Sequence, residues 1–383
     1  MRIVDSTGEL EVLTAELAKA PYIALDTEFM RDQTYWPKLC LIQVAAPGVE
    51  AIIDPLAAGL DLSSFHALLT NAKIVKVMHA ARQDIEIFFH QAAAIPDPLF
   101  DSQVAAMVCG FGEAASYETL ARKLAHVEID KSARFTDWSR RPLSPRQLEY
   151  ALADVTHLRT IYEALSKDLA RTHRTSWVEE EIAALRDPNL YRLEPKDAWK
   201  RLKPRTSSKK FLAILAAVAA WREREAQTRD VPRNRVLKDE AILEIAAHPP
   251  EDAASLEHIR AVPKGFGASR QGKGLLEAIA EGRHSQPPEG FVMERPRRKH
   301  EPSQSAIDLL KTLLRLRAEE ARVAPRLIAN SDDIEKLAAF EDDGVAALHG
   351  WREEVFGRDA RALREGKLAI ALKKGEAVVV ETA

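Results

Sequence analysis

The spacing of apolar runs near the N-terminus constrains the fold of this chain more than any other feature. Short apolar runs cover residues 22–25, 39–45 and 51–53, and a fourth covers residues 74–78. The first three runs lie close together, without room for the crossover helices that parallel strand pairs require. We therefore expect these three runs to form an antiparallel meander.

Downstream of the meander, the pattern alternates between helix and strand. Residues 63–69 and 82–90 have helical periodicity, and helices placed between strands predict parallel pairing. From Ser144 onward the pattern is helical, because Ser144-Pro145 is typical of a cap followed by proline in the first turn. Residues 1–170 are therefore predicted to form one α/β domain.

The composition changes after this domain. Residues 196–210 carry seven basic side chains against one acid, which indicates a linker or a docking strip. A second break, rich in proline and basic residues, covers residues 285–299. The predicted parts are an α/β domain, a helical and basic linker, a first all-α domain, a second linker and a second all-α domain, at residues 1–170, 171–207, 208–285, 286–302 and 303–375.

The two C-terminal segments resemble each other, which predicts a duplicated helical domain. Residues 222–226 are similar to residues 317–321, and residues 236–246 are similar to residues 328–338. The first copy carries 13 basic and 11 acidic residues, whereas the second carries 13 of each. The first copy is therefore the better candidate for contacting phosphate, with help from the basic segment before it.

Composition excludes several classes of protein. Hydrophobic residues make up 46% and charged residues 30% of the 383 residues, as in ordinary globular proteins of two or three domains. No apolar run approaches the ~20 residues that span a bilayer, and the first residues do not resemble a signal peptide. Cys40 and Cys109 lie in apolar patterns, which predicts buried thiols in a reducing cytosol. The net charge of −3 is uninformative about nucleic-acid binding. Because no heptad run indicates an oligomer, we expect a monomer, and the two thiols favour a cytoplasmic location.

Two acidic elements lie next to predicted strands. Asp26-Thr27-Glu28 follows the first apolar run, and period two places both carboxylates on one side of the strand end. Asp84 falls in the first turn of the helix after the fourth run. Each element alone has a more common explanation, a turn or cap for Asp26 and Glu28 and a helix-dipole contact for Asp84.

A late helix supplies the third acidic element. Tyr150 and Asp154 are spaced i, i+4, so a phenol and a carboxylate share one helix face. The apolar residues around them predict a buried face, which puts Asp154 at the edge of the core. An unpaired charge there is costly, and a metal ion would compensate it.

Together these elements resemble the DEDD exonuclease superfamily, in the subclass whose third motif carries tyrosine, and within it the ribonuclease D family. The three motifs cover residues 25–29, 79–86 and 150–155. Gln83 stands where many relatives have glutamate, at a position that is not a metal ligand. The resemblance implies an RNase H-like mixed sheet followed by two small helical domains of the helicase-and-RNase-D C-terminal (HRDC) type.

The resemblance also implies a mechanism, that of a 3′–5′ exoribonuclease releasing nucleoside 5′-monophosphates. Asp26, Glu28, Asp84 and Asp154 would hold two Mg²⁺ or Mn²⁺ ions around the scissile phosphate. Tyr150 would orient the attacking water, since the reference pKa of tyrosine, ~10, makes it a poor base. RNA 3′ ends, and tRNA precursors in particular, are the expected substrates.

Further residues are candidates for binding substrate or supporting the site. Phe29, beside the ligands, is expected to stack on a base, and Thr27 belongs to the same motif. His79 follows a buried strand and is more simply a hydrogen-bonding residue near the core. Asp101 is expected to cap a helix rather than to bind metal. An aromatic and basic cluster is expected to contact RNA, although filling the core explains its tryptophan equally well: Trp138, Arg140 and Arg141.

Three alternatives stay open. A DNA exonuclease of the same superfamily would use the same carboxylates, but the two helical domains and the lack of a Gly-x-x-x-x-Gly-Lys-Ser/Thr loop favour RNA processing. A catalytically silent RNA-binding scaffold would not need all four carboxylates and Tyr150. A metal-free adaptor held together by its helical repeats would leave the carboxylate cluster unexplained.

Overall fold

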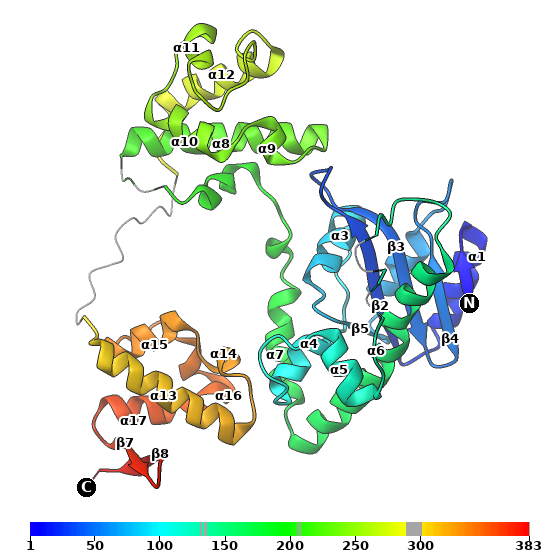
Figure 1. The fold of residues 1–383 in the computed structure, drawn as a ribbon, viewed down its shortest axis with the longest axis vertical. Coiled ribbons are helices and arrows are strands. Elements are labelled where there is room, and N and C mark those ends of the chain that lie inside the picture. Colours follow the sequence, from blue (N-terminus) through cyan, green and yellow to red (C-terminus); the bar gives the residue numbers. More distant parts are fainter. Residues whose placement is uncertain (131, 134–135, 205, 207, 289–300, 383) are drawn as a thin grey trace. The chain divides into compact units, whose positions relative to one another are not determined.

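The computed structural model describes residues 1–130, 132–133, 136–204, 206, 208–288 and 301–382. The chain divides into two compact units, whose helices and strands are labelled in Figure 1. Unit 1 comprises Met1–Glu28, Leu41–Pro188 and Arg297–Ala383, and unit 2 comprises Phe29–Cys40 and Asn189–Pro296. One short segment between two sheet strands therefore belongs to unit 2.

The N-terminal part is built on a six-stranded mixed sheet with the order β1-β4-β3-β2-β5-β6. Strands β3 and β4 are antiparallel, whereas β1 pairs with β4, and β5 with both β2 and β6, in parallel. The order β4-β3-β2 and the antiparallel β3–β4 pair agree with the predicted meander. The strands are Arg2–Val4 (β1), Tyr22–Met30 (β2), Lys38–Ala46 (β3), Val49–Ile53 (β4), Val75–Met78 (β5) and Leu99–Asp101 (β6).

The longest helix of this domain, α6, carries the third motif and packs against β4 and β5. The side chain of Ser144 accepts a hydrogen bond from Gln147 N, which confirms the predicted cap before Pro145, and Gln147 completes a capping box. Apolar residues such as Val155 and Leu158 are buried on one face of the helix. The helices are Thr7–Leu17 (α1), Ser63–Leu69 (α2), Arg82–Ala92 (α3), Ser102–Val108 (α4), Tyr117–Leu120 (α5), Pro145–Thr172 (α6) and Thr175–Leu185 (α7).

Four elements of this domain were not predicted, namely β1, α1, β6 and α5. Strand β1 is short, and its place in the sheet comes from pairing with distant β4, where Ile3 lies opposite Ile52. Both cysteines are free thiols, as predicted; Cys40 is buried, whereas Cys109, also predicted to be buried, is half-buried.

Unit 2 is centred on helix α8, which other helices surround. Helices α10 and α12 and the 3₁₀ helix Pro195–Leu202 all pack against it, so α8 buries residues on several faces. The basic segment predicted as a linker is therefore partly structural, because Trp199 and Leu202 are buried in the core of the unit. The helices are Lys209–Arg229 (α8), Arg233–Val236 (α9), Asp239–Ala247 (α10), Ala253–Glu257 (α11) and Arg270–His284 (α12).

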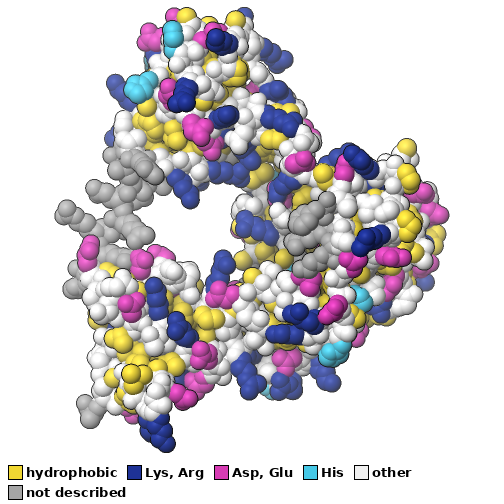
Figure 2. All heavy atoms as spheres, viewed as in Figure 1, with side chains coloured by type: hydrophobic (Ala, Val, Ile, Leu, Met, Phe, Trp, Pro, Cys, Tyr) yellow, Lys and Arg dark blue, Asp and Glu magenta, His cyan; other side chains and the backbone are white. Residues whose placement is uncertain are grey.

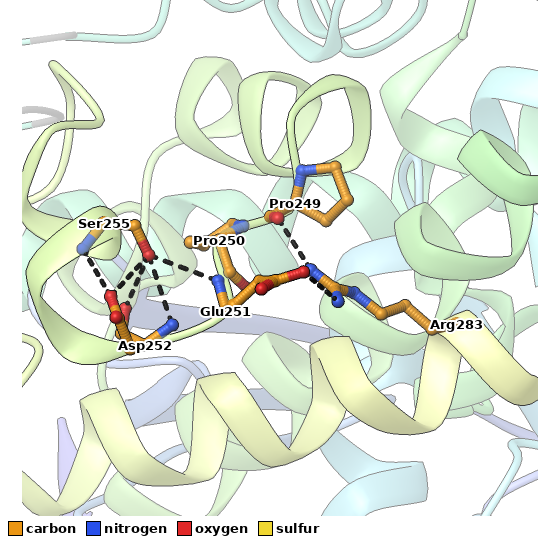
Figure 3. A network of polar contacts seen from close by, with 6 residues as sticks. All are labelled: Pro249, Pro250, Glu251, Asp252, Ser255 and Arg283. Atoms are coloured by element: carbon orange, nitrogen blue, oxygen red, sulfur yellow. Dashed lines mark hydrogen bonds and ion pairs between the residues drawn. The ribbon is translucent and has the colours of Figure 1, made fainter.

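Polar contacts close the end of this unit (Figure 3). Arg283, in the last turn of α12, donates hydrogen bonds to Pro249 O at 2.8 Å and to Glu251 Oε1 at 3.0 Å. Next to them, Asp252 and Ser255 form a capping box that starts α11. The loop before α11 is thus fixed at both of its ends.

The first three helices of the second helical segment follow the same order as those of the first, but one of the two stretches of sequence similarity is out of register with them. Helices α8 and α13 end in the left-handed residues Asp230 and Arg322, and each is followed by a one-turn helix and a longer one. Aligning these helix ends pairs residues 236–246 with residues 328–338, as the sequence similarity did. The earlier match of residues 222–226 with 317–321 differs from this register by three residues. The helices are Gln304–Ala321 (α13), Pro325–Ile328 (α14), Ser331–Ala338 (α15), Gly350–Arg352 (α16) and Arg358–Arg364 (α17).

A hairpin of strands Leu368–Lys373 (β7) and Glu376–Glu381 (β8) follows α17 and was not predicted. It begins inside the segment expected to be all-α. Most of the predicted second linker, residues 289–300, lies outside the described residues. On the face drawn in Figure 2, acidic and basic side chains occur together, in keeping with the small net charge of −3.

Candidate active site

The first two carboxylates of the candidate site lie on β2. Asp26 and Glu28 are two residues apart and half-buried, so they project from one side of the strand. Thr27 between them is only 6% exposed, and its hydroxyl donates a hydrogen bond to Asp84 Oδ1. Thr27 was expected to bind substrate, but its buried side chain instead forms a hydrogen bond with a carboxylate of the site.

Asp84 lies in the first turn of α3, as predicted, and is buried. The turn that leads to it is held by Asp101, whose carboxylate accepts hydrogen bonds from Ala80 N at 3.1 Å and Ala81 N at 2.9 Å. The same carboxylate accepts two N–H groups at the start of α4, at 2.8 and 3.3 Å, which confirms the predicted N-cap. Ala80 has a left-handed φ of 54°, so the turn depends on these contacts.

Helix α6 contributes the last carboxylate. Asp154 is half-buried, one turn after Tyr150. Carboxylate oxygens of Asp26, Glu28 and Asp154 all lie within 4.8 Å of one another. The structure thus brings together three residues that are up to 128 positions apart in the chain, and Asp84 is close enough for its charge to affect Asp26.

Burial and like charge dominate the electrostatics of this group. Burial, followed by the charges of the three neighbouring carboxylates, raises the pKa of Asp26 well above its ordinary value. Burial also raises the pKa of Asp84 to about 7, although the hydrogen bond from Thr27 lowers it. Carboxylates that repel each other in a low-dielectric site fit a divalent cation, which prefers oxygen ligands and offsets the repulsion. The donor set therefore fits the metal ions that the motifs imply.

Tyr117 was not singled out from the sequence, yet it lies against this group. Its hydroxyl donates to Ala153 O at 2.8 Å. Burial, followed by the charges of Asp154 and Asp26, raises the pKa of Tyr117. No local pattern distinguishes this tyrosine, since only the packing of α5 beside α6 brings it to the carboxylates.

His79 has the supporting role that its position after a buried strand favoured. Its Nδ1 lies 2.9 Å from Ser102 Oγ, and its ring packs edge-on against Tyr117 with the centroids 5.7 Å apart. Burial lowers the pKa of His79, so the neutral imidazole is favoured. Phe29, the candidate for base stacking, is the half-buried residue that follows Glu28 on β2.

The three residues of the aromatic and basic cluster have different surroundings and roles. Trp138 is 2% exposed, and its ring lies 6.1 Å from that of Tyr150 at an angle of 31°, so it fills the core rather than facing RNA. Arg141 donates two hydrogen bonds to Asp54, at 2.6 and 2.7 Å, which ties the loop before α6 to the end of β4. Arg140 is exposed and pairs with Asp137 at 3.2 Å, and its contact with RNA stays a prediction.

Comparison with known proteins agrees with this geometry. Residues 1–170 match the family described as 3′-5′ exonuclease, and residues 211–279 match the HRDC domain. The ribonuclease D of Nitrobacter hamburgensis is 47% identical over 381 residues, covering 100% of both chains, and that of Jannaschia sp. is 48% identical over 382 residues, covering 99% of both. The chain belongs to the ribonuclease D family. The crystal structure of Escherichia coli RNase D matches with a TM-score of 0.82 and 28% identity, over 95% of this chain and 98% of that one.

Membership of the ribonuclease D family makes the chain a hydrolase and a 3′–5′ exoribonuclease, as the motifs predicted. The exonuclease family uses divalent metal ions, for which the acidic group is the candidate site. Among the described residues, no helix combines the length and hydropathy needed to cross a membrane.

Proposed function

We propose that this ribonuclease D homologue trims RNA from its 3′ end with two divalent ions, Mg²⁺ or Mn²⁺, held by four carboxylates. The proposed ligands are Asp26, Glu28, Asp84 and Asp154. The observation that carries this proposal is that carboxylate oxygens of Asp26, Glu28 and Asp154, from two distant segments of the chain, lie within 4.8 Å of one another. Such a group of like charges is unfavourable without a cation, so its presence in a folded site supports a metal-binding role.

The bound ions would supply the acidity that activates water and stabilises the leaving 3′ oxygen. The protein's own contribution is to orient the reacting groups. Tyr150 is assigned to positioning the water through its phenol, because a group with a reference pKa of ~10 removes protons poorly at neutral pH. Packing of Trp138 against its ring restrains that phenol. Thr27 and Asp101 hold Asp84 and the turn before it.

RNA 3′ ends are the proposed substrates, with tRNA precursors and other stable RNA as the specific candidates. Escherichia coli RNase D is described as an exoribonuclease involved in structured RNA processing, and the present chain shares its fold over nearly the whole length. The HRDC domain at residues 211–279 is the proposed contact for the RNA backbone, with the basic segment before it. The expected location in the cytoplasm and the monomeric state stay predictions.

The decisive experiment is digestion of matched 5′-labelled RNA and DNA single strands with Mg²⁺, with Mn²⁺ and with EDTA. We expect a ladder of single-nucleotide losses from the RNA 3′ end that EDTA abolishes and that a blocked 3′ hydroxyl prevents. Equal or faster digestion of DNA would contradict the RNA assignment. Trimming of a tRNA precursor with a 3′ extension, compared with an unstructured RNA of equal length, tests the specific substrate.

A further inference from the structure

The connection between β2 and β3 is held by the first helical domain. Phe29–Cys40, which contains this connection, clusters with Asn189–Pro296 in unit 2, although the strands on both sides belong to the exonuclease sheet. Residues 31–37 of the connection directly follow the segment that carries Asp26, Glu28 and Phe29. The helical domain therefore reaches the chain immediately after two of the proposed metal ligands.

Tyr35 is the apolar anchor of the connection. It is 7% exposed and belongs to the core cluster of unit 2, together with Trp199, Leu215 and Trp221. A residue at the tip of a strand connection is normally solvated, because such connections run over the surface. Burial of this ring makes the connection a part of the helical core.

A closed polar network surrounds the hydroxyl of Tyr35. The phenol donates to Glu223 and accepts from Arg233 Nη2 at 2.8 Å and from Gln227 Nε2 at 3.1 Å. Arg233 also binds Glu223 through two hydrogen bonds of 2.6 Å, and its guanidinium lies 4.5 Å from the centre of the tyrosine ring. Burial and the hydrogen bond to Glu223 raise the pKa of Tyr35 to about 12, so the phenol remains a donor at neutral pH.

Asp230 holds the backbone of the same connection. Its Oδ1 accepts hydrogen bonds from Tyr35 N at 3.0 Å and from Trp36 N at 2.9 Å. Asp230 is the left-handed residue that ends α8, with a φ of 48°. The end of this helix thus fixes the connection through main chain and side chain together.

The second helical copy lacks these side chains at the corresponding positions, so the helical fold itself does not require the network. When the left-handed helix ends are aligned, Glu223, Asp230 and Arg233 correspond to Arg315, Arg322 and Pro325. Each charged group that holds the connection is therefore replaced in the second copy. That difference indicates a task specific to the first copy.

We propose that Tyr35, Glu223, Asp230 and Arg233 are positioning residues for the exonuclease reaction. They hold the connection that follows Glu28 and Phe29, and through it they set the end of β2 that presents both side chains to the reacting phosphate and the terminal base. The first helical domain then contributes to catalysis through this connection, in addition to any contact with RNA. The proposal rests on the assignment of Asp26 and Glu28 as metal ligands.

The test compares Asp230→Gly, Asp230→Asn and Tyr35→Phe with the matched control Arg322→Gly, all in the full-length protein. Asp230→Gly keeps the left-handed conformation accessible and removes the acceptor, whereas Asp230→Asn keeps an oxygen in the same place. Arg322 is the exposed counterpart in the second copy. Steady-state kcat and KM are measured on a 20-nucleotide RNA and on a dinucleotide, too short to reach a separate RNA-binding surface.

We expect a ~10-fold fall in kcat on both substrates for Asp230→Gly and Tyr35→Phe, with little change in KM, because small displacements of reacting groups reduce rates strongly. Asp230→Asn should restore most of the rate, and Arg322→Gly should match the parent protein. Unchanged kcat in folded Asp230→Gly overturns the proposal, and so does a rise in KM confined to the longer RNA. If Asp230→Gly fails to fold, Tyr35→Phe decides, and an unchanged kcat there overturns the proposal equally. Full activity of Asp26→Asn would instead overturn the metal assignment on which the proposal rests.

Discussion

Replacement of Asp26 by asparagine tests two properties of the carboxylate group separately. One is the repulsion that destabilises the folded protein, and the other is the metal binding that the reaction requires. The substitution removes one of three charges whose oxygens lie within 4.8 Å of one another. In an effective dielectric of about 20, one pair at that separation repels by roughly 3 kcal/mol. Because the raised pKa of Asp26 relieves part of this repulsion through protonation, we expect a net gain of about 1–2 kcal/mol in the free energy of unfolding when divalent ions are absent.

Urea unfolding in EDTA and in Mg²⁺, read by circular dichroism, measures this effect. In EDTA, Asp26→Asn should be more stable than the parent protein. In Mg²⁺ the parent protein should gain stability as ligand-bound native protein accumulates, whereas the variant should gain far less. Cleavage of end-labelled RNA by the variant should be abolished, and binding of RNA in Ca²⁺ should stay within a few-fold of the parent.

The matched control is Asp343→Asn, at an exposed acid of the second helical domain, which should change stability by less than about 0.5 kcal/mol. A variant Asp26→Asn that is less stable than the parent in EDTA would refute the argument from repulsion. Intact turnover in that variant would refute the assignment of Asp26 to metal binding. The two outcomes are independent, because one concerns the free protein and the other the reaction.

Three further predictions concern the surroundings of the site. Burial raises the pKa of Asp84 from 3.8 to about 7, so the folded protein binds this proton more tightly than the unfolded chain does. The free energy of unfolding in EDTA should therefore fall as pH rises through that interval. Asp84→Asn should flatten this pH profile, as measured by urea titration. Asp101→Ala leaves four backbone N–H groups without their acceptor. We expect the free energy of unfolding to fall by roughly 2–4 kcal/mol and kcat to fall ~10-fold. An unchanged kcat would show that the turn does not position Asp84. Lys76 is fully buried and donates to three backbone carbonyls, so Lys76→Met should lower the unfolding free energy by about 3 kcal/mol, whereas Lys73→Met at an exposed position should leave it nearly unchanged.

The features that could be predicted from the sequence are those with a local physical cause. Period two places Asp26 and Glu28 on one side of β2, and a serine followed by proline starts α6. Spacing of four residues likewise puts Tyr150 and Asp154 on one helix face. These rules place single side chains, and each acidic element alone had a more common explanation. That the carboxylates would meet at one site was implied by the resemblance to the exonuclease superfamily.

The features that sequence patterns missed depend on pairing between distant segments. Strand β1 has only three residues and takes its place from β4, and Tyr117 reaches the carboxylates only because α5 packs beside α6. Asp101 has the expected cap, but its two bonds to the turn before α3 follow from β5 and β6 being parallel neighbours. For Trp138 the sequence left two roles open, an RNA contact and a place in the core, and its 2% exposure decides for the core.

The duplicated helical domains show why similarity of residues is a weaker guide than similarity of position. The matching letters at 222–226 and 317–321 are three residues out of register with the helix ends, because both helices repeat small and charged residues that align in several ways. In the structural register, the same helix end binds the exonuclease part of the chain in both copies. Asp230 holds Tyr35 in the first, while in the second Ala321 O accepts from Arg174 at 2.6 Å and Ala324 N donates to Met107 O at 3.0 Å. The corresponding helix ends therefore hold different segments of the chain, and the charged residues that hold the β2–β3 connection have no counterpart of the same kind at the end of α13.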